Sequence, residues 1–212
     1  DPYSKNHNTR YKLIKQLLER RTLNKANKLY IPVVGQEKSY HIDQNKILVR
    51  EQLIPNVSLS SNLEFDNNFY HIFYAGRFYQ EFRNPQNLFK AIDILIEAGY
   101  KIRFHYFGKI SDNKFILDQI NSLKNQDNFL IHGILEREYL LDVMKKMDLL
   151  INIFNKGLKQ VPSKLSEYSM ANRPIINILE KRNWDNYENK IEFTDNKVDS
   201  ILTSIKEKIL YS

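Results

Sequence analysis

The 212-residue sequence contains no cysteine, a single tryptophan and only six glycines and six prolines. A chain without cysteine has no disulfide, no thiolate metal ligand and no cysteine nucleophile, which suits a reducing compartment. No stretch approaches the roughly 18 uninterrupted apolar residues of a membrane-spanning helix, and the first ten residues lack the apolar block of a signal peptide. We therefore expect a cytoplasmic protein of one or two globular domains.

Several short motifs of ligand and metal sites are absent as well. The sequence has no G-x-x-x-x-G-K-[ST], no G-x-G-x-x-G, no H-E-x-x-H and no D-x-D. This excludes a P-loop, a typical dinucleotide site and a carboxylate metal motif. Five histidines are scattered at positions 7, 41, 71, 105 and 132, and we expect those within strands to be packed or bound to backbone. The sequence therefore predicts neither a metal nor another cofactor.

Positive charge is concentrated at one end of the chain. The net charge is +7, and residues 1–60 hold 11 Lys or Arg and 5 Asp or Glu, whereas residues 61–212 hold 21 and 20. A nucleic-acid-binding domain would spread or stripe its positive charge through the folded part, so we expect no nucleic-acid partner. The basic end could hold the protein near anionic lipid, at the inner face of a membrane, although a solvated helix explains the same charges.

Strand-like and helix-like periods alternate from residue 69 onward. Apolar runs predict five strands, at residues 69–76, 101–108, 128–133, 148–154 and 174–179. Between these strands, apolar residues recur at helical spacing and predict helices. A last amphipathic helix is expected at 198–210. The first of these helices begins at Asn84-Pro85 and ends at Gly99, which are typical start and stop residues. This alternation predicts an α/β fold with a doubly wound parallel sheet and right-handed crossovers.

Residues 1–55 predict a smaller, separate piece. It contains a basic amphipathic helix at about 9–27 and two strands, at 28–34 and 46–53. Two strands cannot make a domain, so we interpret this piece as the remnant of a first α/β domain from a longer polypeptide. Residues 56–212 then form the second domain.

Four of the six glycines lie at or just beyond the carboxyl ends of predicted strands: Gly76, Gly108, Gly133 and Gly157. In an open α/β sheet, ligands bind outside these ends, where backbone amides can approach a phosphate or a base. Strand-to-helix turns often contain glycine for conformational reasons alone. We interpret the clustering as a ligand crevice of unspecified chemistry.

Charged side chains are predicted at the same edge of the sheet. Arg77 follows the first of these glycines and Arg83 stands at the entrance to the next helix, where two guanidinium groups would suit a phosphate. Lys164 and Glu167 share one face of a later helix that opens there. The alternative interpretations are two solvated arginines and a simple salt bridge between Lys164 and Glu167. His132 stands at a strand end and could contact a ligand.

Several motifs occur in a recognisable order along residues 66–180: FYAGRFY, RNPQNLFKAIDIL, FHYFGK, NFLIHGIL and DLLINIFNKGLKQVPSKLSEYSMANRPIINI. This order resembles the C-terminal, donor-binding domain of a GT-B fold glycosyltransferase. More narrowly, it resembles the large retaining family (group 1, or family 4) whose bacterial members build capsule, O-antigen and exopolysaccharide. The most specific parts are Gly76-Arg77 and the Pro-Ser-Lys-Leu-x-Glu-Tyr block before an Arg-Pro-Ile-Ile strand. Residues 9–55 look like the last units of the family's N-terminal, acceptor domain and its linker.

The resemblance implies roles for single residues. Glu167 would hold the ribose hydroxyls of a nucleotide-sugar, and Arg77 and Lys164 would be catalytic, facing the diphosphate, with Arg83 as another candidate for the second charge. The other implied donor-binding positions are Gly76, Gly108, His132, Gly133, Ile134 and Ser163, and the backbone of 132–134 would meet the base. The family's second glutamate, eight positions before Glu167, is Lys159 in this sequence.

The implied reaction is transfer of a sugar from a nucleotide diphosphate, UDP rather than GDP, to an acceptor hydroxyl with retention and without metal. The acceptor would be a glycan or a lipid-linked glycan, in polysaccharide or lipopolysaccharide biosynthesis. This piece alone should bind the donor nucleotide weakly and transfer nothing. Two alternatives stay open: a nucleotide-sugar epimerase of the same fold, and a non-catalytic module that binds a nucleotide or a partner.

Overall fold

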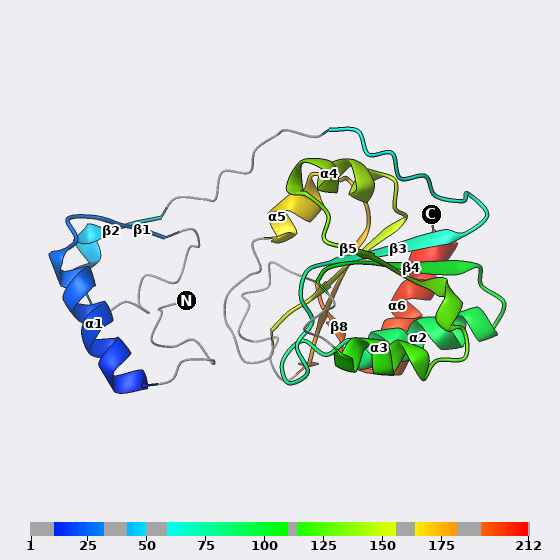
Figure 1. Ribbon diagram of the computed structural model, residues 1–212, viewed down its shortest axis with the longest axis horizontal. Coiled ribbons are helices and arrows are strands. Elements are labelled where there is room, and N and C mark those ends of the chain that lie inside the picture. The colour runs from blue at the N-terminus through cyan, green and yellow to red at the C-terminus, as the bar shows by residue number, and fades with distance from the viewer. Residues whose placement is uncertain are drawn as a thin grey trace. The chain divides into compact units, whose positions relative to one another are not determined.

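Figure 1 shows the computed structural model of the chain, which describes residues 11–31, 42–49, 59–109, 114–155, 164–181 and 192–211. The chain divides into two compact units, residues 1–55 and 56–212. Each unit contains a parallel sheet of its own.

The first unit combines one long helix with a two-stranded sheet. Helix α1 (Lys12–Lys25) precedes strand β1 (Leu29–Ile31), the 3-10 helix η3 (Gln44–Lys46) and strand β2 (Ile47–Val49). The two strands pair in parallel, with Leu29 opposite Ile47. Apolar side chains of α1 are exposed: Leu13, Ile14, Leu17 and Leu18. The helix and both strands lie within the predicted ranges and are shorter, but 32–34 and 50–53 fall outside the described residues.

The second unit is built on a six-stranded parallel sheet. Its strands are β3 (Tyr70–Ala75), β4 (Ile102–Phe107), β5 (Phe129–Gly133), β6 (Leu149–Ile153), β7 (Ile175–Leu179) and β8 (Thr194–Asp195). They lie in the order β5-β4-β3-β6-β7-β8, and every neighbouring pair is parallel. The first five confirm the predicted strands. The sixth, β8, has no counterpart among the predicted strands, because two residues are too few to give a hydrophobic period.

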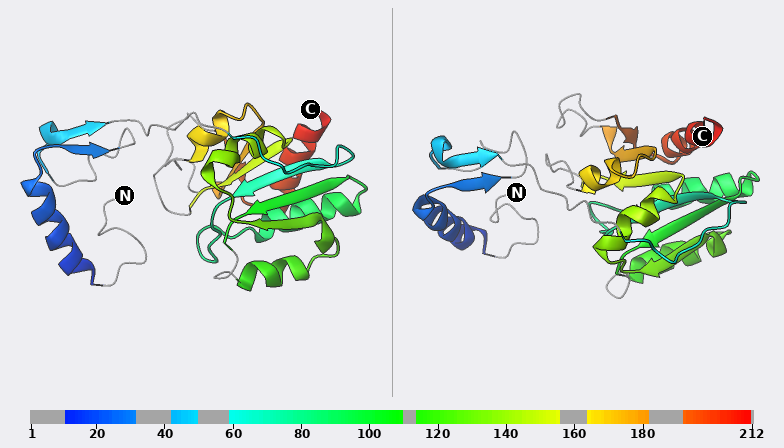
Figure 2. Two further views of the ribbon diagram at one scale, coloured as in Figure 1. Left: turned by 45° about the horizontal axis from the view of Figure 1, so that its top comes forward. Right: turned by 90° about the horizontal axis from the view of Figure 1, so that it is seen from above.

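Helices cover both faces of this sheet (Figures 1 and 2). They are α2 (Gln86–Glu97), α3 (Lys114–Asn121), α4 (Arg137–Lys145), α5 (Lys164–Ser169) and α6 (Val198–Leu210). On one face, a buried cluster joins the sheet to α2, α3 and α6 through side chains such as Leu88, Ile116 and Ile201. On the other face, a second cluster joins the sheet to α4 and α5 through Val143 and Tyr168. This arrangement confirms the doubly wound α/β fold.

Helix α2 shows how local sequence sets the element bounds. The Asn84 side chain accepts a hydrogen bond from the backbone N–H of Gln86 at 3.0 Å, which satisfies one of the free donors of the first turn. The helix begins at Gln86 with Pro85 as its N-cap, one residue later than predicted. At the other end Gly99 has φ +93°, and the Tyr100 N–H returns to the Leu95 carbonyl at 3.1 Å. The predicted glycine stop is therefore confirmed, because the left-handed region favours glycine.

In the described ranges, no helix is both long and apolar enough to cross a bilayer. Within the same ranges, no three His, Cys, Asp or Glu side chains are grouped as a metal site would need.

Candidate functional site

The strand order reverses between β3 and β6, because β4 and β5 lie on one side of β3 and β6 to β8 on the other. Open α/β sheets bind ligands outside the carboxyl ends of the strands at such a switch point. A cavity of about 460 Å³ lies at this edge of the sheet. Six of the ten residues predicted for the site line it: Gly76, Arg77, Gly108, Ile134, Lys164 and Glu167. The fold thus brings together residues that are up to 91 positions apart in the sequence.

The glycines after β3 and β4 lie against each other at the cavity. The Gly76 N–H donates to the Phe107 carbonyl at 2.9 Å, and Gly76 has φ +123°, a conformation that side-chain-bearing residues rarely adopt. A Cβ atom on Gly108 would lie 2.6 Å from the Gly76 carbonyl oxygen and would also meet the Tyr106 hydroxyl. Glycine is therefore required at both positions for two different reasons, conformation at Gly76 and space at Gly108.

The side chain of Lys164, the first residue of α5, contacts the end of β3. Its Nζ lies 3.4 Å from the Ala75 carbonyl oxygen and 4.3 Å from the centre of the Tyr74 ring. Burial lowers the pKa of Lys164 well below its usual value, and the charge of Arg83 lowers that pKa further. A negatively charged ligand would be favoured beside this cation because it would offset the cost of desolvation.

Glu167 forms an ion pair with Arg137, the first residue of α4. Lys164 is instead held by a carbonyl and two aromatic rings, so the alternative of a Lys164–Glu167 salt bridge is wrong. Arg137 could not be found from the sequence, because 30 positions separate it from Glu167 and no local spacing links the two. The Glu167 side chain retains 21% exposure, so a ligand could still approach this carboxylate.

The two predicted arginines do not line the same cavity. Arg77 lines the large cavity, whereas Arg83 lines a smaller one of about 60 Å³. The Arg83 Nε donates to the Asn155 side-chain oxygen at 2.8 Å, and its Nη1 lies 3.4 Å from the Arg77 carbonyl. Arg83 therefore contacts the Arg77 backbone, and its charge acts on Lys164, but Arg83 is not among the described residues that line the large cavity.

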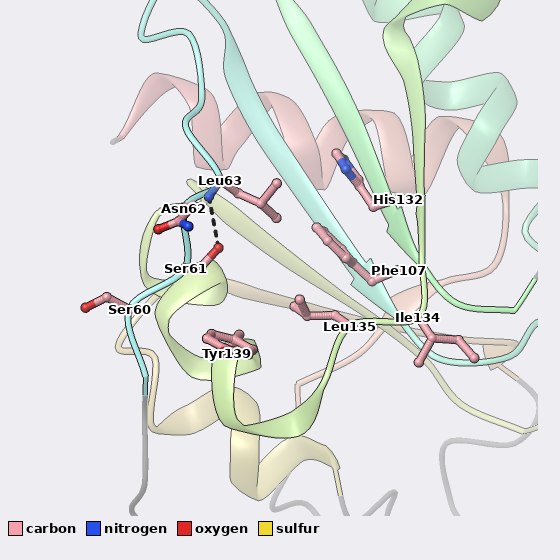
Figure 3. Close-up of a pocket in the computed structure, with 9 residues that line it drawn as sticks. All are labelled: Ser60, Ser61, Asn62, Leu63, Phe107, His132, Ile134, Leu135 and Tyr139. Carbon is pink, nitrogen blue, oxygen red and sulfur yellow. Dashed lines mark hydrogen bonds between the residues drawn. The ribbon is translucent and has the colours of Figure 1, made fainter.

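A second cavity, of about 400 Å³, adjoins the first because Phe107, Ile134 and Leu135 line both. Figure 3 shows its lining, in which the His132 ring lies beside Phe107. The two rings are stacked with centroids 4.4 Å apart. Gly133 ends β5 with φ +80° and lines neither of these two cavities. The structure thus brings the side chain of His132, rather than only its backbone, to the cavity.

The opposite wall of the second cavity comes from residues 60–63, which are not among the residues predicted for the site. Hydrogen bonds join this segment to α4 and to the residue that follows it. The Ser61 N–H donates to the Asp142 carboxylate at 2.8 Å, and the Lys146 ammonium donates to the Ser61 carbonyl at 2.8 Å. A further hydrogen bond joins the Leu63 N–H to the Ser61 hydroxyl at 3.0 Å (Figure 3). No hydrophobic period marks this segment, so only the tertiary contacts reveal it.

Three residues named from the sequence lie outside the described residues: Gly157, Lys159 and Ser163. Their part in the site stays a prediction.

A scan against protein-family models found no match, and a search of curated proteins found none either. Solved structures do match. TarM has a TM-score of 0.59 at 15% identity over 93% of this chain and 40% of TarM. HepE of Anabaena, in complex with UDP-glucose, has a TM-score of 0.65 at 10% identity over 92% of this chain and 58% of HepE.

Two further structures extend the comparison. A glycosyltransferase from Rickettsia africae has a TM-score of 0.61 at 14% identity, over 90% of this chain and 56% of that protein. A Listeria monocytogenes protein, named for UDP-N-acetylglucosamine 2-epimerase activity, has a TM-score of 0.56 at 10% identity over 99% of this chain. The chain spans about 40 to 60% of the length of these solved proteins. At such identities the likeness shows the fold, and the chain has the Rossmann-like α/β fold of the GT-B glycosyltransferases.

Proposed function

We propose that this chain carries the donor-nucleotide site of a glycosyltransferase, which takes a sugar from a nucleoside diphosphate. The observation that carries the proposal is the first cavity, where Gly76, Arg77, Gly108, Lys164 and Glu167 meet at the switch point of the sheet. Cations and close backbone amides suit a diphosphate, and a carboxylate can accept hydrogen bonds from ribose hydroxyls. All three kinds of group line this cavity.

The positive groups would act mainly through electrostatics. When the glycosidic bond to the diphosphate breaks, negative charge develops on the leaving phosphate oxygens. Arg77 and the half-buried ammonium of Lys164 would stabilise this charge in a partly desolvated site, where such interactions are strongest. Binding of a dianion would also raise the pKa of Lys164, because it supplies the missing negative partner.

The finer part of the proposal follows the sequence resemblance. The donor is a UDP-sugar, the acceptor is a glycan or a lipid-linked glycan in polysaccharide assembly, and the anomeric configuration is retained. The enzyme acts in the cytoplasm, at the inner face of a membrane, and without metal. HepE was crystallised with UDP-glucose, and a variant of S. aureus TarM was crystallised with UDP. Both complexes support uridine as the base.

Calorimetric titration of the chain with UDP, GDP, ADP and CMP tests the proposal. We expect selective binding of UDP, weakened about tenfold by Glu167→Ala, since one ligand hydrogen bond to a charged group contributes roughly that much. Arg77→Ala should weaken diphosphate binding at least as strongly. The matched control is Glu97→Ala, which removes a carboxylate at the far end of α2 that pairs with Lys124 at 2.5 Å, and it should bind UDP like the wild type.

Failure to bind any of the four nucleotides would contradict the proposal and favour the non-catalytic module. The Listeria monocytogenes neighbour favours an epimerase as the second candidate. Product analysis separates the two enzymes, because an epimerase releases a changed free sugar nucleotide whereas a transferase leaves the sugar on an acceptor.

A further inference from the structure

Three histidines on neighbouring strands form a continuous chain of hydrogen bonds. His71 lies on β3, His105 on β4 and His132 on β5. The Nδ1 of His71 lies 2.8 Å from the Nε2 of His105, and the Nδ1 of His105 lies 2.9 Å from the Nε2 of His132. At the inner end, the Nε2 of His71 lies 2.9 Å from the backbone oxygen of Asp66. We name these three side chains the histidine relay.

The carbonyl at the inner end fixes every proton in the histidine relay. A carbonyl oxygen only accepts, so His71 must carry its proton on Nε2 and, when neutral, has a bare Nδ1. His105 must then donate from Nε2 to that Nδ1, which leaves its own Nδ1 bare. By the same step, His132 donates from Nε2 to His105 and keeps a bare Nδ1. All three rings therefore have the same tautomer, and the outer ring ends in an acceptor.

Burial favours the neutral form of His105 and His132 at pH 7. His71 and His105 are 4% and 1% exposed, and the Phe65 ring lies edge-on to His105 at 5.0 Å. Burial, followed by the charges of the other relay histidines and Arg103, lowers the pKa of His105 to about 3. Burial also lowers the pKa of His132. The other charged groups beside the relay are Asp66, whose carboxylate accepts from Asn68, and Asp148, whose carboxylate accepts from the His71 backbone N–H.

The outer end of the relay reaches the second cavity. The His132 ring lines that cavity and is stacked on Phe107 (Figure 3). Its Nε2 is taken by His105, and its Nδ1 has no hydrogen-bond partner among the described residues. The Phe107 ring is stacked on it with centroids 4.4 Å apart, and the His105 ring lies nearly coplanar with it at 5.2 Å, so the ring cannot turn without breaking its hydrogen bond to His105.

We propose that His132 binds the edge of the bound base, because the histidine relay fixes its Nδ1 as a hydrogen-bond acceptor for an N–H group there. The imide N3–H of uracil has the required chemistry. His71 and His105 are positioning residues, which act by holding the tautomer of His132. The inference rests on the proposed function, since the second cavity adjoins the one assigned to the diphosphate and ribose.

The tautomer can be measured without any ligand. Nitrogen-15 NMR of the whole chain at pH 7 distinguishes a ring protonated on Nε2 from one protonated on Nδ1. We expect all three relay rings to carry their proton on Nε2, as the chain of hydrogen bonds requires. A His132 ring that carries its proton on Nδ1, or that is charged at pH 7, would overturn the proposal. His105→Phe keeps an aromatic ring in place but removes the acceptor for His132, so His132 should then show a mixture of tautomers.

The specificity is tested by calorimetry with UDP, N3-methyl-UDP and 5-methyl-UDP. Methylation of N3 removes the donated proton, so we expect about tenfold weaker binding, whereas the 5-methyl control should bind within about twofold of UDP. In His132→Ala, UDP and N3-methyl-UDP should bind with similar, weak affinity.

The outcomes separate the two proposals. If UDP binds and weakens with Glu167→Ala, but N3-methyl-UDP binds equally well to the wild type, the role of His132 is wrong and the proposed function stands. If no nucleotide binds, both are wrong, and the NMR result still decides whether the histidine relay has the tautomers derived above.

Discussion

At the scale of single residues, Lys164 is a cation whose burial in the fold costs free energy. No carboxylate among the described residues pairs with it, and its Nζ is held by a carbonyl oxygen at 3.4 Å and by the faces of Tyr74 and Tyr168. A lysine whose pKa is lowered in the folded state binds its proton more tightly when unfolded. The free energy of unfolding therefore rises as the pH is raised towards the ordinary pKa of lysine. Such a residue is typical of a site that awaits an anion.

Replacing this lysine should separate stability from binding. We expect Lys164→Met to raise the free energy of unfolding of the unliganded chain by about 1 kcal/mol at pH 7, because it removes a desolvated charge and keeps the volume. The same variant should bind UDP at least tenfold more weakly. Urea denaturation and calorimetry measure the two effects. Lys124→Met, which removes an exposed cation paired with Glu97, should change neither, and a destabilised Lys164→Met would show that the ammonium stabilises the empty site.

His105 should make the fold sensitive to mild acid. Its pKa is about 3 in the folded chain against 6.5 ordinarily, so the unfolded chain binds more protons between these values. The free energy of unfolding must then fall as the pH decreases from about 6.5 towards 3, by about 1.5 kcal/mol between pH 6.5 and 5. Urea denaturation at several pH values measures this slope.

The control for this slope is His105→Phe, in which the contribution should disappear. Carboxylates with lowered pKa values, such as Asp66, Asp142 and Asp195, lose their stabilising contribution mainly below this window. An unchanged slope in His105→Phe would mean that other groups cause the acid sensitivity.

At the scale of elements, the site depends on how strands β3 and β4 end. Gly76 and Gly108 follow adjacent parallel strands, in which Ala75 is paired with Phe107. This register places the two glycines against each other and brings their backbones to the cavity wall. A parallel sheet aligns all its carboxyl ends at one edge, so the alignment follows from the topology rather than from either strand alone.

Substitution of these glycines should therefore affect stability and binding together. We expect Gly108→Ala to lower the free energy of unfolding by about 2 kcal/mol, because its Cβ would lie 2.6 Å from the Gly76 carbonyl oxygen, and to weaken UDP binding as well. Gly99→Ala is the matched control, since φ +93° at the end of α2 is also strained for alanine but lies away from the cavity. It should cost about 1 kcal/mol and leave UDP binding unchanged.

At the scale of the whole molecule, nearly all of the described buried apolar side chains belong to the second unit. The two large clusters on the faces of its sheet contain only residues of 56–212, whereas Ile31 is the buried apolar residue described in the first unit. The described residues that line the two cavities all belong to the second unit. Stability and donor binding should therefore belong to this unit.

Removal of residues 1–55 tests this division. We expect residues 56–212 alone to unfold cooperatively and to bind UDP with an affinity within about threefold of that of the 212-residue chain, because no described lining residue is lost. Circular dichroism during thermal unfolding and calorimetry are the measurements. Loss of cooperative unfolding would show that the first unit contributes to the core of the second.

The sequence by itself determined the fold class and the five main strands, because buried parallel strands and amphipathic helices have different hydrophobic periods. It also determined helix α2, whose start and stop depend on the local chemistry of Asn84 and Gly99. It named six residues that meet in one cavity, since punctuation at strand ends marks the edge where ligands bind.

Only the tertiary structure decided which of these side chains touch. The pairing of Arg137 with Glu167, the separation of Arg83 from the large cavity and the wall formed by 60–63 each depend on contacts between distant segments. The histidine relay is the clearest case. In sequence, His71, His105 and His132 are isolated, 34 and 27 positions apart. The side-by-side placement of β3, β4 and β5 turns them into one hydrogen-bonded chain, because hydrogen bonding requires a separation near 3 Å that no linear pattern encodes.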